Sequence, residues 1–146
     1  MPSDWITPDS DVANGWTNPT LAYDANTATY AYYDVPKQQW SPYLELWLAT
    51  ALLCTKVRVW SSRTSSTIER IAVSVYYGGA WHEIYQAALT VDSYVEYAVG
   101  SEQLVSAVRV RYWNNSYSLT KQARCNEAAF YGAYPALGRS FGCIIG

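Results

Sequence analysis

Charged side chains are scarce in this chain of 146 residues. Asp, Glu, Lys and Arg together make up 15% of it, against about 25% in an average soluble domain. The formal net charge is -2, and the basic residues are scattered along the chain. Nucleic-acid-binding proteins usually carry a stripe of Lys and Arg that neutralises phosphates, so we expect no nucleic-acid partner.

The chain also lacks a long apolar run. The longest, residues 46–54, is interrupted by Thr50 and is far shorter than the ~20 residues that an α-helix needs to span a bilayer, so we expect no membrane insertion. The N-terminus, Met1-Pro2-Ser3-Asp4, has neither the basic start nor the apolar stretch of a signal peptide. We therefore expect the chain to begin with the folded domain itself.

Cysteine and histidine are rare as well. Cys54, Cys125 and Cys143 are odd in number and form no Cys-x-x-Cys pair, which argues against a zinc cluster or a disulfide framework. We expect small buried thiols, with a Cys54–Cys125 disulfide as the alternative.

His82 is the only histidine, and the sequence has no Gly-x-Ser-x-Gly, His-Glu-x-x-His or P-loop pattern. We therefore expect a protein that is not an enzyme.

Aromatic side chains are abundant, with 14 Tyr and 7 Trp, and they recur in short stretches of alternating apolar and polar residues. Alternation of period two is typical of a half-buried strand. Seven or so such runs cover residues 43–48, 56–60, 71–77, 80–85, 95–99, 108–112 and 123–131. Gly78-Gly79 predicts a hairpin, and residues 100–102 predict a turn between two further strands. The pattern predicts an all-β fold, an antiparallel β-sandwich or jelly roll.

The length fits a single domain, which we place at residues 1–132, including a lead-in anchored by Trp5 and Trp16. Residues 133–146 differ from it, because they contain one charge, Arg139, and end in Phe-Gly-Cys-Ile-Ile-Gly. An apolar end on a polar domain needs a surface that covers it. The alternatives are packing along its own sandwich and docking on a neighbouring subunit as a C-terminal arm.

A polar loop precedes the strands. Asp24, Asn26 and Thr29 place a carboxylate, an amide and a hydroxyl within six residues. Calcium binds six to eight oxygens from such groups, so the loop is a candidate cation site. The alternative is a plain turn, because Asp, Asn and Thr also bond to their own main chain.

Four pieces of the sequence, in this order, resemble one family. Residues 24–30 read Asp-Ala-Asn-Thr-Ala-Thr-Tyr, near a pattern of Asp-Gly-Asn/Asp-x-x-Thr and an aromatic residue. Residues 40–48 begin with Trp and continue with alternating apolar residues, and residues 71–81 form a strand, a Gly-Gly turn and a Trp. Residues 127–132 keep a Glu-x-x-x-x-Gly spacing. Over roughly residues 20–132, the chain resembles the discoidin, or coagulation factor 5/8 type C, group of galactose-binding-like jelly rolls.

The resemblance implies a structural calcium ion shared by the N-terminal loop and the closing glutamate. Its ligands would be Asp24, Asn26, Thr29 and Glu127, with main-chain carbonyls completing the shell. The chain departs from the pattern at Ala25, where the family has glycine. If that position needs a positive φ, alanine is strained there by ~1 kcal/mol or more. Without metal, the same residues would join the two ends of the sandwich by hydrogen bonds.

Aromatic residues at predicted loops and strand ends are candidates for ligand binding. A flat ring beside amide or guanidinium groups can stack on a sugar while its neighbours bond the hydroxyls, and loops at the ends of a sandwich often carry function. The alternative for each ring is packing in the core. The predicted patch comprises Trp113, Asn114, Asn115, Tyr117 and Arg111, together with Trp81.

These observations favour a non-catalytic binding or assembly protein. Our main hypothesis is a virus or phage structural component, a capsid decoration or a tail or attachment protein, because the jelly roll shows no signal peptide, catalytic partner or linker. It would lie on a virion or another extracellular assembly and contact protein neighbours, including copies of itself. The alternative is a stand-alone, lectin-like carbohydrate-binding module, and the two are compatible if a virion protein binds glycans.

Overall fold

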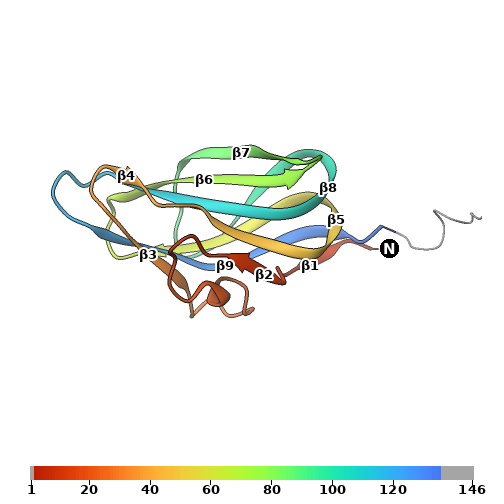
Figure 1. Cartoon of the computed structure of the whole chain (residues 1–146), viewed down its shortest axis with the longest axis horizontal. Helices are drawn as coiled ribbons and strands as arrows, with labels where there is room; N and C mark the ends of the chain where they lie inside the picture. Colours follow the sequence, from red (N-terminus) through yellow and green to blue (C-terminus); the bar gives the residue numbers. More distant parts are fainter. Residues whose placement is uncertain (1, 136–146) are drawn as a thin grey trace, which may run out of the picture.

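The computed structural model describes residues 2–135, which form a two-layered antiparallel sandwich (Figure 1). The described part of the chain holds nine strands in one hydrogen-bonded network, with a short 3-10 helix, η1, at Pro19–Ala22. The strands are β1 Asp4–Ile6, β2 Ser10–Val12, β3 Ala31–Val35, β4 Gln39–Trp40, β5 Leu44–Arg63, β6 Ile68–Tyr77, β7 Ala80–Ala88, β8 Tyr94–Asn114 and β9 Lys121–Ala133. The predicted all-β sandwich is confirmed.

The two layers share the long strands β5 and β8. In one layer, called here the β6 layer, the N-terminal part of β5 and the C-terminal part of β8 pair with each other, and β2, β4, β6 and β7 complete the layer. In the other, the β9 layer, the C-terminal part of β5 and the N-terminal part of β8 join β1, β3 and β9. Each long strand therefore bends from one layer into the other.

The sequence predicted two separate strands where β8 is continuous, and this prediction was wrong. Gly100, at φ +107°, lies within the strand instead of ending it. The chain does not reverse there, because residues 103–105 continue to pair with residues 52–54 of β5. Register shifts in β5 after Trp47 and after Cys54 mark bulges, which bend a strand and increase its twist.

The core lies between the layers and follows the predicted alternation. Ile71, Val73 and Val75 of β6 face it, and so do Val108 and Val110 of β8, all of them fully buried. The next inward residues of β8, Tyr112 and Asn114, join the two layers by hydrogen bonds: the Tyr112 hydroxyl lies 2.7 Å from that of Ser61 in β5, and the Asn114 amide donates to the Val35 main-chain oxygen in β3. The residues between them face outward on the β6 layer.

Two predicted features of the fold are confirmed by local geometry. Gly78 and Gly79 have φ values of +62° and +81° and connect β6 to β7, as a two-residue hairpin requires. The lead-in is anchored by its two tryptophans. Trp16 is buried, and its ring centroid lies 5.8 Å from that of Tyr112. The ring centroid of Trp5 lies 5.0 Å from that of Tyr131.

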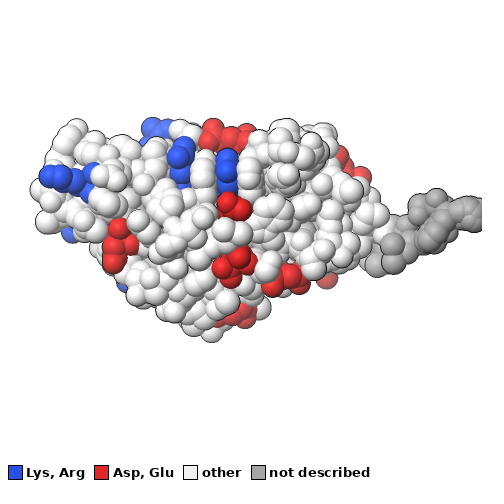
Figure 2. Space-filling view, in the orientation of Figure 1, with Lys and Arg blue, Asp and Glu red and all other residues white. Residues whose placement is uncertain are grey.

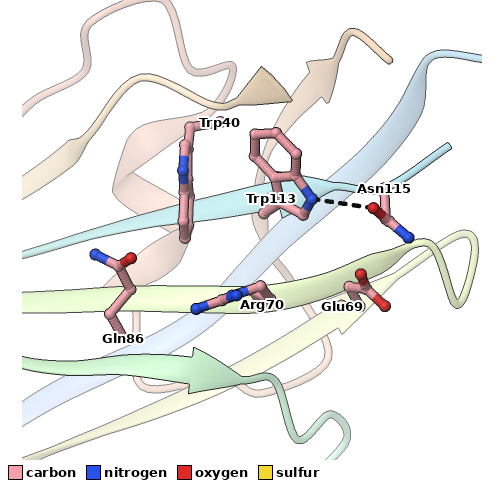
Figure 3. Close-up of a pocket in the computed structure, with 6 residues that line it drawn as sticks. All are labelled: Trp40, Glu69, Arg70, Gln86, Trp113 and Asn115. Carbon is pink, nitrogen blue, oxygen red and sulfur yellow. Dashed lines mark hydrogen bonds between the residues drawn. The ribbon is translucent and has the colours of Figure 1, made fainter. Parts of the chain in front are cut away.

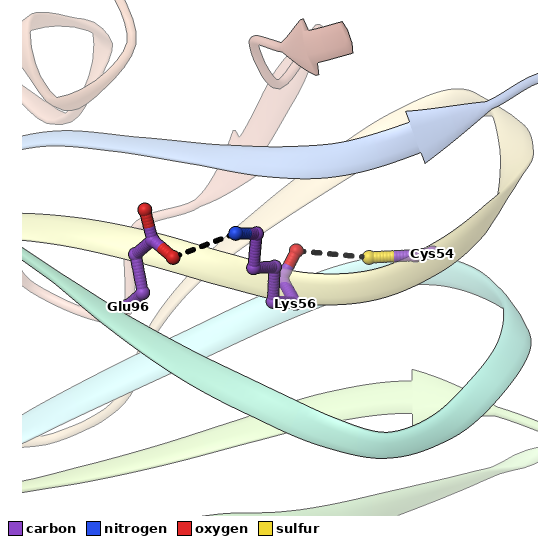
Figure 4. A network of polar contacts seen from close by, with 3 residues as sticks. All are labelled: Cys54, Lys56 and Glu96. Carbon is purple, nitrogen blue, oxygen red and sulfur yellow. Dashed lines mark hydrogen bonds and ion pairs between the residues drawn. The ribbon is translucent and has the colours of Figure 1, made fainter. Parts of the chain in front are cut away.

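Cys54 and Cys125 are buried and free, so the expectation of buried thiols is confirmed for these two and the disulfide does not form. Burial raises the pKa of the Cys125 thiol to about 12. Cys54 donates its S–H to the main-chain oxygen of Lys56, at 3.3 Å, and the Lys56 ammonium pairs with Glu96 at 2.7 Å (Figure 4). Cys143 lies outside the described residues.

The predicted C-terminal arm also lies almost entirely outside the described residues, which end at Pro135. Ala133 still belongs to β9, where it pairs with Leu53, and Tyr134 packs against the core. Within residues 2–135, we find no helix with the length and apolar character needed to cross a membrane.

Candidate functional site

The Asp24 loop is held by its own polar side chains. Asp24 accepts a hydrogen bond from the Asn26 main-chain N–H at 3.0 Å, and Asn26 accepts one from the Ala28 N–H at 2.9 Å. The Thr29 hydroxyl donates to the second oxygen of Asp24. These are the local turns that short polar side chains favour, so the turn alternative describes the internal structure of the loop.

The loop is also joined to β9, as the closing-glutamate pattern predicted. The Ala25 N–H donates to Glu127 Oε2 at 2.8 Å, and the Asn126 amide donates to the Thr27 main-chain oxygen at 2.9 Å. Ala25 has φ +61°, which is the left-handed conformation that costs a residue with a Cβ atom about 1–2 kcal/mol. The conformation directs its N–H at the carboxylate, so the predicted strain is present and has a structural role.

Glu127 is nearly as buried as the core, with 2% of its surface exposed. Burial raises the pKa of its carboxyl from 4.5 to about 7. The main-chain N–H groups of Ala25 and Asp24 and the charge of Arg58 oppose the rise, and the negative charge of Asp24 adds to it. Among the described residues, its Oε1 atom has no hydrogen-bond partner. An unpartnered buried carboxylate oxygen costs free energy unless a proton or a cation satisfies it.

The chemistry of the donor set partly matches what calcium requires. Asp24, Asn26, Thr29 and Glu127 offer only oxygen atoms, which is the donor chemistry that calcium prefers, and Glu127 Oε1 is unpartnered. The small number of carboxylates limits the fit, because residues 2–135 contain no group of three or more His, Cys, Asp or Glu that could hold a metal. The donor set fits a calcium ion only if main-chain carbonyls supply the remaining ligands.

A second candidate site is a groove at the end of the β6 layer, near the loop after β8 (Figure 3). It has a volume of about 330 Å³ and is lined by Trp40, Glu69, Arg70, Gln86, Trp113 and Asn115. A hollow of about 370 Å³ is lined by Ala87 and Ala88 together with the same Glu69 and Arg70. The groove is therefore one part of a wider depression over β6 and β7.

Strand register brings these side chains together. Trp113 of β8 pairs with Trp40 of β4 on one side and with Arg70 of β6 on the other. The two indole rings lie 5.7 Å apart at an angle of 59°. The Trp113 Nε1–H donates to Asn115 Oδ1 at 3.4 Å, and Gln86 of β7 approaches from the opposite wall (Figure 3).

The groove combines two half-buried aromatic rings with several hydrogen-bonding groups. Arg70 supplies donors, Glu69 supplies acceptors, and the amides of Gln86 and Asn115 supply both. Rings provide a flat apolar surface, and a few placed polar groups fix the orientation of a ligand. The arrangement can bind a small molecule that has an apolar face and polar edges.

The structure brings together part of the predicted patch. Trp113 and Asn115 line the groove. Arg111 lies next to it, with its guanidinium carbon 4.6 Å from the centre of the Trp40 ring. Tyr117 is 80% exposed on the loop that follows β8. These four residues lie at the same end of the sandwich.

The other two predicted residues have different positions. Asn114 is fully buried: its amide donates to the main-chain oxygens of Val35 and Leu119, both at 2.9 Å, and accepts from the Ser116 N–H. Its hydrogen bonds are used to hold the loop after β8, so it does not face a ligand. Trp81 pairs with Tyr76 at the opposite end of β6, far from the groove.

Sequence reasoning missed Trp40, Glu69, Arg70 and Gln86. The sequence predicts Trp40 only as the first residue of one piece of the family resemblance, ahead of a strand, whereas its pairing with Trp113 makes it the second ring of the groove. Residues of β6 and β7 can be aligned by counting outward from the Gly78-Gly79 turn. A register shift between Val73 and Ser74, however, moves the β7 partner of each residue from Arg70 to Val73 by one position. That bulge has no clear sequence signal.

No protein-family model matches the chain, and no curated protein matches its sequence. Solved structures do match its fold. The family 32 carbohydrate-binding module of AlyQ, in complex with 4,5-unsaturated mannuronic acid, is 15% identical with a TM-score of 0.64, over 87% of this chain and 97% of that one. The F5/8 type C domain of a Bacteroides fragilis protein is 13% identical with a TM-score of 0.62, over 90% and 98%.

A third match is the family 32 carbohydrate-binding module of Clostridium perfringens NanJ, in complex with galactose. It is 12% identical with a TM-score of 0.56, over 88% of this chain and 91% of that one. The chain thus has the fold of the discoidin-like, galactose-binding-like domains, and the resemblance read from the sequence is confirmed at the level of the fold.

Proposed function

We propose that the chain is a non-catalytic carbohydrate-binding module that holds a sugar in the groove lined by Trp40 and Trp113. The observation that carries the proposal is the pair of indole rings, 5.7 Å apart, beside Arg70 and Asn115. A sugar ring presents C–H groups on its face and hydroxyls at its edge, so it matches rings flanked by donors and acceptors.

The structural neighbours support this alternative better than the virus hypothesis. Two of them are carbohydrate-binding modules described in complex with a sugar. Nothing in the fold or its neighbours indicates a capsid or tail protein, and the predicted assembly partners, homo-oligomer and virion location remain predictions. A glycan is therefore the predicted partner that the structural neighbours support.

The proposal is tested by binding the full chain to a glycan array and titrating the glycans that bind. Trp113→Ala and Trp40→Ala should each weaken binding about tenfold or more, because a stacked ring contributes ~1 kcal/mol beyond the surface it buries. Trp60→Ala is the matched control: its ring also packs against an aromatic residue, Tyr94 at 5.3 Å, but in the β9 layer. Wild-type affinity in both groove variants, or no glycan bound by wild type, would contradict the proposal.

We also propose a structural role for calcium at the Asp24 loop. The support is the all-oxygen donor set and the buried, unpartnered Glu127 Oε1. An ion that binds only the folded chain stabilises it, by ~2.7 kcal/mol at a concentration one hundred times its dissociation constant. Added calcium should therefore raise the melting temperature of chelator-treated protein, and an unchanged melting temperature would contradict the proposal.

A further inference from the structure

The outer face of the β6 layer carries a row of aromatic and arginine side chains that extends well beyond the groove. Along β8 the inward residues 108, 110, 112 and 114 are fully buried, so Arg109, Arg111 and Trp113 face outward. The register places Tyr76 and Trp81 in the same outer row as Ala107. Ala107 and Trp113 are six positions apart along β8, a distance of about 20 Å in an antiparallel strand.

Rings and guanidinium groups alternate without a gap along this face. The Arg111 guanidinium carbon lies 4.6 Å from the Trp40 ring centre and 4.7 Å from that of Tyr43. The Arg109 guanidinium carbon lies 3.9 Å from Tyr43 and 4.4 Å from Trp81. Trp81 continues the row to Tyr76 and Trp47, with ring centres 5.2 and 5.8 Å away.

Both arginines have a buried Nε–H donor without an acceptor among the described residues. In the part of the chain that the structure describes, Arg109 and Arg111 take part in no ion pair, and their buried Nε atoms have no acceptor. Arg109 pairs in register with Glu45, yet the Glu45 carboxylate accepts from Trp47 Nε1, at 3.1 Å. Arginine has N–H donors on three nitrogen atoms, and half-buried donors without an acceptor call for an explanation.

The charges of this face are balanced. Arg70, Arg109 and Arg111 are matched by Glu69 beside Arg70 on β6, by Glu45 opposite Arg109 on β5, and by Glu83 on β7. In Figure 2, basic and acidic side chains lie next to one another over the strands of this layer and do not form separate patches. A face with aromatic rings, free donors and no excess charge suits a chain of neutral sugars, whereas an acidic chain would meet the three carboxylates.

We propose that the groove is one end of a longer binding platform, and that the chain binds an internal stretch of a neutral polysaccharide laid along β8 from Trp113 to Trp81. This inference rests on the proposed function and deepens it. The rings stack on successive sugars, and the Arg109 and Arg111 guanidiniums donate to hydroxyl and ring oxygens. The platform is far longer than one sugar ring, so affinity grows with the length of the glycan.

The test is titration calorimetry of the full chain with neutral gluco-, manno-, xylo- and galacto-oligosaccharides of two and six units, and with a galacturonate hexamer. We expect a neutral hexasaccharide to bind about tenfold or more tightly than its disaccharide and more tightly than the galacturonate hexamer. Arg109→Ala and Trp81→Ala should remove most of this gain and leave disaccharide binding in the groove unchanged. Trp81→Phe, which keeps a ring, should retain part of it.

Arg58→Ala is the matched control, because the Arg58 guanidinium carbon stacks in the same way, 4.2 Å from Trp5 and 3.9 Å from Tyr94, but in the β9 layer. If stacking only stabilises the sheet, Arg58→Ala and Arg109→Ala will both lower the melting temperature and neither will change the dependence on glycan length. That result, equal affinity of wild type for short and long glycans, or preference for the galacturonate, would overturn the inference and leave the proposed function intact. Failure of every oligosaccharide to bind would overturn this inference, and a glycan array without any bound glycan would in addition overturn the proposed function.

Discussion

Replacement of Glu127 by glutamine should stabilise the protein at alkaline pH. The glutamine can keep the hydrogen bond from the Ala25 N–H, but it carries no charge to bury. Glu127 is 2% exposed, and burial raises the pKa of its carboxyl from 4.5 to about 7. The wild-type protein therefore buries an ionised carboxylate above pH 7, and the variant does not.

The direction in which stability changes with pH follows from proton binding by Glu127. Between pH 4.5 and 7 the folded wild type holds a proton on Glu127 that the unfolded chain has released, so its free energy of unfolding falls as pH rises through this range. The shift of about 2.5 pH units, from 4.5 to 7, corresponds to about 3 kcal/mol. Glu127→Gln should match wild type near pH 4.5 and exceed its stability by up to about 3 kcal/mol at pH 8.

The assay is thermal unfolding, followed by circular dichroism from pH 4.5 to 8.5 in chelator and in calcium. In chelator at pH 8, the variant should melt roughly 6–12 °C above wild type. In calcium the difference in melting temperature should shrink or change sign, because a cation would satisfy the wild-type carboxylate but not the amide of the variant. Glu96→Gln is the control, since that side chain is 52% exposed and pairs with Lys56 at the surface.

Two results would refute this reasoning. If wild type and Glu127→Gln lose stability in parallel from pH 4.5 to 7, the burial of Glu127 does not control the pH dependence. If the variant is less stable at pH 8 in chelator, the ionised carboxylate is satisfied by the protein itself. In either case the unpartnered Oε1 atom would not be the reason for a cation at this loop.

Four further substitutions test the fold, the groove and the Asp24 loop. Asn114→Ala should cost about 2–4 kcal/mol of unfolding free energy, because it leaves buried main-chain partners unsatisfied, whereas Asn115→Ala should change stability by less than about 0.5 kcal/mol and weaken glycan binding. Gly132→Ala should prevent folding, since the new Cβ would lie 2.0 Å from the Leu53 main-chain oxygen; a soluble variant with the wild-type melting temperature would contradict this. Ala25→Gly should raise the melting temperature by roughly 2–4 °C by removing about 1 kcal/mol of left-handed strain, and a lower melting temperature would contradict that.

The local parts of the fold could be predicted from the sequence because their signals are local. Period-two alternation located the inward faces of β6 and β8, and Gly78-Gly79 located the hairpin. The continuity of β8 could not be predicted, because a glycine with positive φ looks the same in a turn and in a bent strand. Only the pairing of residues 103–105 with β5 distinguishes the two.

The two candidate sites also differ in how much of each could be predicted from the sequence. The Asp24 loop and Glu127 lie 103 residues apart in sequence, and the motif spacing of the family resemblance joined them correctly in space. The groove has no such motif. Its walls come from four strands, and Arg70 and Gln86 reach it only through cross-strand register, which a bulge shifts by one residue. The buried role of Asn114 was equally invisible, because an Asn after a strand reads as an exposed loop residue.

The sharing of β5 and β8 between the layers has a consequence for how the molecule opens. In a sandwich whose strands each belong to one sheet, a sheet can in principle fray while the other survives. Here the central strands of both layers are the same two pieces of chain, linked without interruption. Amide protons at the centres of β6 and β9 should therefore exchange with deuterium through one common global opening, with similar protection, while the edge strands β2 and β7 exchange earlier.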